Sequence, residues 1–359
     1  MRVAVKSLSE LVDGGVVQLT RGKIISKKDI AACPGSYPVY SSAKEGDGRF
    51  GEYGRYMFDE ELITWSVDGG GRLFHRPKHR FSVTNVGGVL RILQPATLDY
   101  KYLYYALTLR HSETTFDWVK KAHPSVIKKL YIDIPVPPLA EQQRMVGVLD
   151  EAFAGLATAQ AHAAQNLQNA RALFESHLQS VFTHRGKGWV ETTIGDQVQL
   201  QRGFDITKEQ QRPGNVPVVS SGGIKSFHDT AMVRAPGVVM GRKGTLGKVF
   251  YLEQDYWPHD TTLWVKDFKG NDPRFVYHFF TSLDVTGFDS GTANPALNRN
   301  QIHPLPVCWP PTAKQQELVT QLDALAGETQ RLTRLYEQKQ AALAALKKSL
   351  LHQAFTGEL

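Results

Sequence analysis

The chain has 359 residues, of which 42% are hydrophobic and 21% are charged. This length exceeds one ordinary core and the composition is typical of a soluble globular protein, so we expect two or more domains. The sequence has neither a run of 18 apolar residues nor a signal-peptide pattern at its N-terminus, which argues against a membrane span and against secretion. Two cysteines, Cys33 and Cys308, lie far apart without metal-ligand spacing. We therefore expect a cytoplasmic protein with reduced thiols and no bound metal.

The net charge of +7 and the isoelectric point near 9.2 fit a polyanionic partner, although basic charge alone is a weak indicator of nucleic-acid binding. The charge is unevenly distributed. Residues 1–140 hold 20 Lys and Arg against 14 Asp and Glu, whereas residues 189–313 hold 12 of each. If the two halves bind the same kind of partner, their net charges contribute unequally to that binding.

In chain order, short strand-like runs separated by Gly and Pro come first, as in residues 61–74 and 86–93. A short helix is expected over residues 100–110, and a long proline-free helix follows from Glu141 to about Phe182. The order then repeats, with strand-like runs at 237–252 and 261–268, a short helix at 273–283 and a second long helix to the end. This order predicts β-rich α+β domains, each followed by a long helix.

The second half is a divergent copy of the first. "VQLTRG" (Val17–Gly22) recurs as "VQLQRG" (Val198–Gly203), and "IPVPPLAEQQRMV" from Ile134 recurs as "LPVCWPPTAKQQELV" from Leu305. Internal repetition on this scale indicates a duplicated architecture, and we expect a pseudo-twofold arrangement of the copies. We place the first globular domain at 1–140, its helix at 141–185, the second domain at 186–313 and its helix at 314–359.

Both long helices show heptad spacing over about five heptads, which is typical of a coiled coil. Pro137-Pro138 and Pro310-Pro311 begin them, because proline has no N–H to lose at a helix start. We predict an antiparallel pair about 60 Å long, with one globular domain at each end. An ordinary helical hairpin inside one large domain is the alternative. The predicted interface comprises Leu149, Phe153, Leu156, Leu167, Leu322, Leu325, Leu332, Leu343, Leu346 and Leu350.

Three stretches imitate catalytic motifs without meeting their requirements. "GRKGTLGKV" (Gly241–Val249) lacks the spacing of a phosphate-binding loop, and "DGGGR" (Asp68–Arg72) precedes no helix, so both are interpreted as turns. "NPAL" (Asn294–Leu297) lacks the aromatic residue that would stack on a flipped base, and no cofactor loop precedes it. No His or Cys group has zinc spacing. We expect a chain that performs no chemistry.

Taken together, the sequence resembles the specificity subunits of type I restriction-modification systems. The resemblance covers nearly the full length and rests on the two Pro-Pro/Gln-Gln stretches, the heptad helices that follow them, "LLHQAFTGEL" at the end and "GRKGTLGKVFYL". It implies two target recognition domains, each reading one half of a bipartite, gapped site in double-stranded DNA. The helices would set the gap and dock two adenine-methyltransferase subunits, through which ATP-driven restriction subunits would join. S-adenosylmethionine, ATP and Mg²⁺ would belong to those partners, and this chain would hold no cofactor.

Candidate DNA contacts are the basic or polar residues near predicted turns, because Lys and Arg position a protein on phosphates while base edges specify the sequence. In the first domain they are Arg21, Lys23, Lys44, Arg49, Arg72, Arg76 and Arg80, and in the second Arg202, Lys225, Arg242, Lys243 and His259. Each of them is also compatible with an ordinary solvated surface residue. Two other functions are kept open: a stand-alone DNA-binding regulator without a methyltransferase partner, and a catalytic DNA methyltransferase or nuclease.

Overall fold

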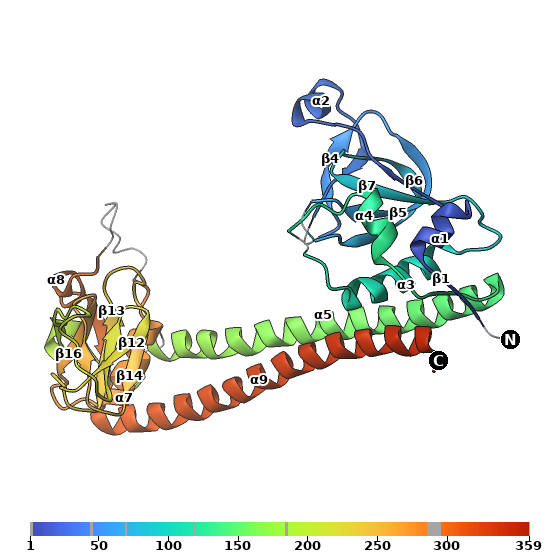
Figure 1. Ribbon diagram of the computed structural model, residues 1–359. Helices are drawn as coiled ribbons and strands as arrows, with labels where there is room; N and C mark the ends of the chain where they lie inside the picture. Colours follow the sequence, from blue (N-terminus) through green and yellow to red (C-terminus); the bar gives the residue numbers. More distant parts are fainter. Residues whose placement is uncertain are drawn as a thin grey trace. The chain divides into compact units, whose positions relative to one another are not determined.

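The computed structural model describes residues 3–43, 46–68, 70–117, 119–183, 186–285 and 296–358. The chain forms two compact units. Unit 1 contains residues 1–162 and 339–359, and unit 2 contains residues 163–338. Each unit consists of a β-rich head together with parts of two long helices, α5 (Leu139–Thr183) and α9 (Thr312–Thr356) (Figure 1). Both helices begin two residues before the predicted positions, and the predicted domain limits stay a prediction.

The head of unit 1 is built on a six-stranded sheet of order β2-β7-β5-β6-β3-β4. Neighbouring strands are antiparallel except β3 and β6, which are parallel. A separate pair joins the first strand to the strand that precedes α5. The strands are β1 (Ala4–Lys6), β2 (Val17–Arg21), β3 (Tyr37–Tyr40), β4 (Arg49–Tyr53), β5 (Phe58–Ser66), β6 (Leu73–Val83), β7 (Gly87–Ile92) and β8 (Ile134–Val136).

One face of this sheet is covered by helices. Figure 1 shows α3 lying between the sheet and α5. The core accordingly draws Trp65 from the sheet, Tyr102 from α3, Leu149 from α5 and Phe355 from the end of α9. The final turns of α9 are therefore part of the core of unit 1. The helices of this head are α1 (Leu8–Asp13), α2 (Lys27–Ala32), α3 (Tyr100–Glu113) and α4 (Pro124–Leu130).

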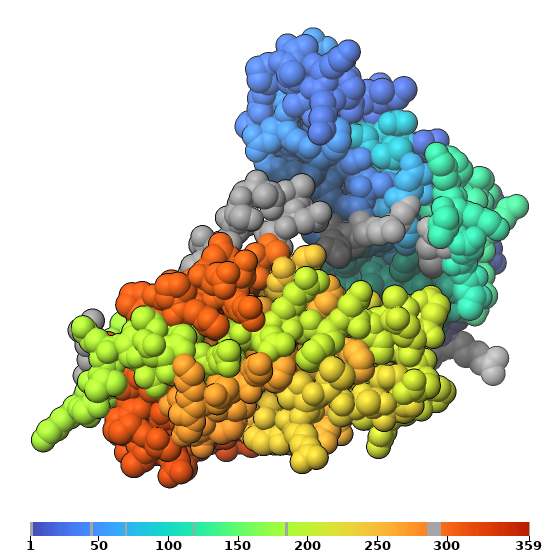
Figure 2. Space-filling model, turned by 90° about the vertical axis from the view of Figure 1, so that its left-hand side faces the viewer, coloured from blue at the N-terminus to red at the C-terminus, as the bar shows by residue number. Residues whose placement is uncertain are grey.

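The head of unit 2 repeats this plan with one long strand divided into two. The sheets β10-β16-β13-β14 and β12-β11-β15 together follow the strand order of unit 1, with β14 and β15 in place of β6. The strand-rich segment (yellow) occupies one side of this unit, and the segment of α7 and early α9 (orange to red) occupies the other (Figure 2). The elements are β9 (Val190–Thr193), α6 (Ile194–Gln197), β10 (Gln199–Arg202), β11 (Val216–Ser220), β12 (Gly223–His228), β13 (Gly237–Gly241), β14 (Val249–Leu252), β15 (Trp257–Pro258), β16 (Thr262–Asp267), α7 (Pro273–Ser282), α8 (Arg299–Ile302) and β17 (Pro306–Trp309).

The predicted α+β class and internal duplication are confirmed by this correspondence of elements. "GRKGTLGKV" forms the connection of the β13–β14 hairpin, and the described residues of "DGGGR", Asp68 and 70–72, lie at the β5–β6 connection, as expected for turns. Asn294 and the next residue of "NPAL" lie outside the described residues.

The two long helices are antiparallel within each unit. In unit 1, the early part of α5 meets the late part of α9, with the Lys347 ammonium 5.0 Å from the centre of the Phe153 ring. In unit 2, the late part of α5 meets the early part of α9, where Arg171 Nη2 lies 3.0 Å from Glu337 Oε1. The predicted pairing direction therefore follows from contacts inside each unit.

Much of the burial along the two helices follows a seven-residue repeat. In α5 the repeat comprises Gln142, Leu149, Leu156, Ala163 and Ala170, and in α9 it starts with Gln315, Leu322 and Thr329; Leu178 and Leu318 are also buried but lie outside it. Phe153, Leu167, Leu325, Leu332, Leu343 and Leu350 are half-buried. Leu346 departs from the predicted interface because it is 47% exposed. The reason is that the last turns of α9 direct Leu351, Ala354 and Phe355 into the core of unit 1, which turns Leu346 outward.

Candidate nucleic-acid interface

The repeated Arg-Gly pair at the end of β2 and of β10 anchors a turn in each head. A side chain at Gly22 would place its Cβ 2.0 Å from the carbonyl oxygen of Val83, and one at Gly203 would lie 2.1 Å from that of His259. Only glycine permits such an approach of two backbones. The preceding arginines bind the next residues of the same turns: Arg21 Nε donates to the Asn85 carbonyl at 2.9 Å, and Arg202 Nη2 donates to Asp260 at 2.8 Å. The motif "VQLxRG" thus fixes equivalent turns in the two heads.

Three turns meet at one end of unit 2, and we call them turn cluster 2: residues 221–222, 242–247 and 259–261. The Ser221 N–H donates to Thr261 Oγ1 at 3.3 Å, and the N–H groups of Arg242 and Lys243 donate to the Thr261 carbonyl at 2.9 and 3.1 Å. Arg202 joins through Asp260. Four of the five candidate cations and polar residues of the second domain therefore lie together, and the fifth, Lys225, follows on the exposed strand β12.

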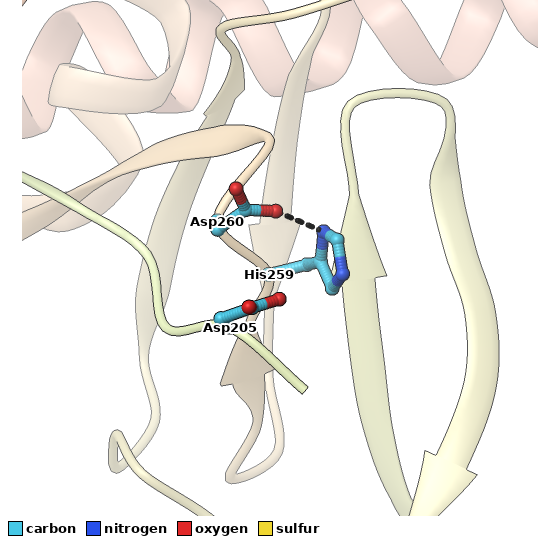
Figure 3. Close-up of side chains that lie close together, drawn as sticks. All are labelled: Asp205, His259 and Asp260. Carbon is cyan, nitrogen blue, oxygen red and sulfur yellow. Dashed lines mark ion pairs between the residues drawn. The ribbon is translucent and has the colours of Figure 1, made fainter. Parts of the chain in front are cut away.

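The side chains at the centre of turn cluster 2 form an ion-pair network. Figure 3 shows the His259 ring beside Asp260, with Asp205 from the segment after β10 on its other side. His259 Nδ1 lies 3.0 Å from Asp260 Oδ1, while the second oxygen of Asp260 accepts from Arg202. The three ligand atoms of Asp205, His259 and Asp260 lie within 4.8 Å of one another. One of the two carboxylates, that of Asp260, already binds an arginine, Arg202.

Arg242 lies against this network. Burial lowers the pKa of its guanidinium, the nearby positive charge of Arg202 lowers it further, and Asp260 opposes both effects. Arg202 and Arg242 therefore lie close to the carboxylates of Asp205 and Asp260, and a guanidinium is a group that binds phosphate well.

Unit 1 has the equivalent arrangement, which we call turn cluster 1: residues 41–43, 66–72 and 84–86, without the undescribed residue 69. The hydroxyls of Ser41 and Thr84 are 2.8 Å apart, and the Asp68 N–H donates to Ser42 Oγ at 3.1 Å. Arg72 belongs to this cluster, and the backbone of Lys23 forms an isolated parallel β-bridge with Thr84. Lys44, also a candidate contact, lies outside the described residues.

Arg76 and Arg80 are placed differently from the other candidates. Arg76 is only 5% exposed, its guanidinium lies 3.6 Å from the centre of the Tyr40 ring, and it donates to the Asp47 carbonyl at 2.6 Å. Burial lowers the pKa of Arg76 to about 10. The Arg76 guanidinium therefore lies inside the head, where its hydrogen bond to Asp47 supports the connection between β3 and β4. Arg80 is exposed and is paired with Asp59 at 3.1 Å.

For the remaining candidates, contact with DNA stays a prediction. Sequence reasoning considered only basic and polar residues, so it passed over the exposed apolar side chains Phe50, Ile224 and Phe227 on the outer strands β4 and β12. A search for basic and polar residues cannot find apolar side chains, and the sheet order is what places these three on edge strands.

A buried glutamine attaches each head to its long helix. Gln142 Oε1 accepts from the Asp99 N–H at 2.9 Å, and Gln142 Nε2 donates to the carbonyls of Thr97 and Pro137 at 2.9 and 2.8 Å. Gln315 repeats the pattern in unit 2, where Oε1 accepts from the Asp272 N–H at 2.9 Å and Nε2 donates to the Pro310 carbonyl at 3.1 Å. Asp99 and Asp272 cap α3 and α7. The second glutamine of each pair, Gln143 or Gln316, is exposed.

A carboxylate on each long helix completes the attachment. Asp150 accepts from Lys101 and, at 2.6 Å, from the Tyr105 hydroxyl, both of α3. Burial raises the pKa of Asp150, but its hydrogen bonds with Lys101 and Tyr105 outweigh that effect and lower it.

Asp323 holds α7 in the equivalent way. It accepts from Arg274 Nε at 3.1 Å and lies 2.7 Å from His278 Nε2. Both heads therefore use an aspartate, a cation and a ring-bearing donor at equivalent positions.

Comparison with known proteins identifies relatives for both halves. Residues 10–165 and 186–341 each match the family described as "Type I restriction modification DNA specificity domain". A putative type I specificity subunit of Mycoplasma pneumoniae is 24% identical over 323 residues, which cover 86% of this chain and 87% of that protein.

Solved structures share the fold over almost the whole chain. One, from a study of complex assembly and conformational transition in the type I R-M system, has a TM-score of 0.74 at 13% identity and covers 96% of this chain and 98% of that one. The HsdS subunit of Thermoanaerobacter tengcongensis has a TM-score of 0.56 at 14% identity, with 96% and 97% covered. Within the described residues, no helix is both long enough and apolar enough to cross a membrane.

Proposed function

Because this chain belongs to the family of type I restriction-modification DNA specificity proteins, we propose that its two heads read the two halves of one bipartite, gapped DNA site. The observation that carries the proposal is the pair of equivalent turn clusters, which present different side chains on the same backbone plan. Two different readers on one chain suit an asymmetric site with two parts. Base edges then supply specificity, and the exposed cations supply position.

The long helices act as the spacer that sets the gap, and they dock two adenine-methyltransferase subunits. Support comes from their equal length of 45 residues and from the fact that each begins in one unit and ends in the other. ATP-driven restriction subunits join through the methyltransferases. The specificity chain is non-catalytic in this assembly, and S-adenosylmethionine, ATP and Mg²⁺ are bound by its partners.

The experiment is to produce the full chain with a type I adenine methyltransferase of its own organism, in a host without adenine methylation, and to map methylated adenines in the host DNA. We expect an asymmetric site of two short parts separated by a fixed gap, with one modified adenine per part. A continuous site, or methylation without sequence preference, would contradict the proposal. Failure of the two proteins to copurify would favour a stand-alone DNA-binding regulator.

The spacer role is tested by removing one heptad from the middle of both helices, residues 163–169 and 336–342. Removing seven residues shortens a helix by about 10.5 Å and preserves its buried repeat, so the preferred gap should shrink by about 3 base pairs. Insertion of one heptad at the same point is the matched control and should lengthen the gap by the same amount. A gap unchanged in both variants would refute the spacer role while leaving the reading role intact.

A further inference from the structure

The outermost strands of the two heads, β4 and β12, carry the same irregularity. β4 pairs with β3 and β12 pairs with β11, and each is the edge of its sheet. In β12, Ile224 faces Val219 and the next pair is Ser226 with Val218, so Lys225 is an extra residue. In β4, Arg49 faces Tyr40 and the next pair is Gly51 with Val39, so Phe50 is the extra residue. Both strands therefore have a β-bulge at equivalent positions.

The bulge determines which side chains share a face. Directly paired residues lie on the same side of a sheet, and paired positions two apart on the partner strand also share a side. Ile224 and Phe227 face Val219 and Pro217, which are two residues apart, so the bulge brings them to one face although they are three residues apart. Bulges commonly re-aim side chains near functional sites in this way.

The shared face is exposed in both heads but chemically different. In unit 2, Ile224 is 55% and Phe227 is 52% exposed, with the exposed Lys225 between them. In unit 1, the equivalent face carries the exposed Arg49 and Glu52, which pair with each other, and the exposed Phe50 lies between them in the strand. One backbone frame thus displays an apolar surface in one head and a mainly charged surface in the other.

Double-stranded DNA is the partner that this surface fits. The end of the β11–β12 hairpin lies against the Arg242–Gly247 turn, because a Cβ at Gly244 would contact Ser221 Oγ at 3.6 Å. The apolar face is therefore flanked by the cations of turn cluster 2 and by Lys225, which complement phosphates. A two-stranded β-ribbon fits the major groove of B-DNA, where the methyl group of thymine is the apolar feature of the base edges.

We propose that β12 is the specificity-determining strand of unit 2 and that Ile224 and Phe227 read thymine methyl groups in one half-site. The equivalent strand β4 reads the other half-site with its charged face. The inference rests on the proposed function, since it names the residues by which each head distinguishes bases.

The test uses the full chain with its methyltransferase partner and duplexes that carry the mapped site. Each thymine is replaced in turn by deoxyuridine, which removes only the methyl group. We expect at least one replacement in one half-site to weaken binding about fourfold, the effect of losing one buried methyl. In Phe227→Ala or Ile224→Ala that replacement should have no further effect, whereas the other half-site should respond as it does in the unsubstituted protein.

Val190→Ala is the matched control, because Val190 is also an exposed apolar strand residue of unit 2 and lies outside this surface. It should leave all deoxyuridine effects unchanged. The inference is overturned if neither half-site depends on a thymine methyl, or if the dependence persists in both β12 variants. Either result is compatible with a bipartite site and would leave the proposed function standing. The absence of sequence-selective methylation by the unsubstituted complex would refute the proposed function instead.

Discussion

Replacement of Gln142 by alanine is predicted to loosen the first head from its helix, whereas the same change at Gln143 is predicted to have little effect. The two glutamines are adjacent and chemically identical, but only Gln142 is buried. Its amide links the N–H of Asp99 to the carbonyls of Thr97 and Pro137. Removing it leaves these three backbone groups without their partner at the start of α3.

The expected magnitude follows from those three hydrogen bonds. A hydrogen bond contributes roughly 1 kcal/mol net, and more when its loss leaves a buried group unsatisfied, so Gln142→Ala should destabilise the junction by about 3 kcal/mol. That corresponds to an increase of about 100-fold in the equilibrium constant for local opening. Gln143→Ala changes an exposed helical position and should stay within about 0.5 kcal/mol.

Hydrogen exchange resolved along the chain is the suitable assay, because a protein with two units lacks a single free energy of unfolding. Peptides covering the start of α3 and the start of α5 should exchange about 100-fold faster in Gln142→Ala and at the unsubstituted rate in Gln143→Ala. Gln315→Ala and Gln316→Ala should reproduce this difference in unit 2. Equal exchange in Gln142→Ala and Gln143→Ala would refute the assignment of the junction to the buried amide.

Three further outcomes are expected. Burial lowers the pKa of His278, so its stabilising contribution is present above the ordinary histidine pKa and is lost as pH falls below that value. His278→Tyr should therefore flatten the pH dependence of hydrogen exchange in α7 between pH 7.5 and 5.5. An unchanged pH dependence would exclude His278 as its cause. Gly203→Ala should destabilise unit 2 by about 3 kcal/mol, because the added Cβ clashes with backbone. Gly155→Ala, in open space on α5, should stabilise its helix by up to about 1 kcal/mol. The two variants should therefore shift the temperature of thermal unfolding in opposite directions. Arg76→Lys should destabilise unit 1 by about 2 kcal/mol through loss of ring stacking and hydrogen bonds, and the exposed Arg80→Lys provides the comparison by denaturant unfolding.

The sequence predicted the organisation of the chain well because repetition and periodicity are visible in residue order. Two "VQLxRG" motifs and two Pro-Pro/Gln-Gln stretches identified the duplication, and heptad spacing identified both long helices. The sequence could not show that the end of α9 completes the core of unit 1, since Phe355 and Tyr102 are brought together only by tertiary packing. That packing is also the reason why the predicted interface fails at Leu346.

Prediction of the candidate site was less complete because charge indicates exposure poorly. Arg76 and Arg80 are four residues apart in one basic cluster, yet the first is enclosed against Tyr40 and the second is exposed beside Asp59. Phe227 shows the opposite error, since an aromatic residue in a strand pattern would ordinarily be assigned to a core. Its exposure depends on the edge position of β12 and on the bulge, and neither is written in the local sequence.

The comparison of the two heads separates the constraints that act on attachment from those that act on recognition. At the junctions, Gln142 and Gln315 make equivalent hydrogen bonds, and Asp150 and Asp323 each bind a cation and a ring-bearing donor. On the edge strands, the bulge is kept while its exposed side chains differ. Under the proposed function, a head can therefore change what it reads without changing how it is held. If the edge strands read the two half-sites and the helices set the gap, as proposed, exchanging the exposed residues of β4 and β12 should alter the half-sites and leave the gap length unchanged, because the long helices and both junctions remain intact.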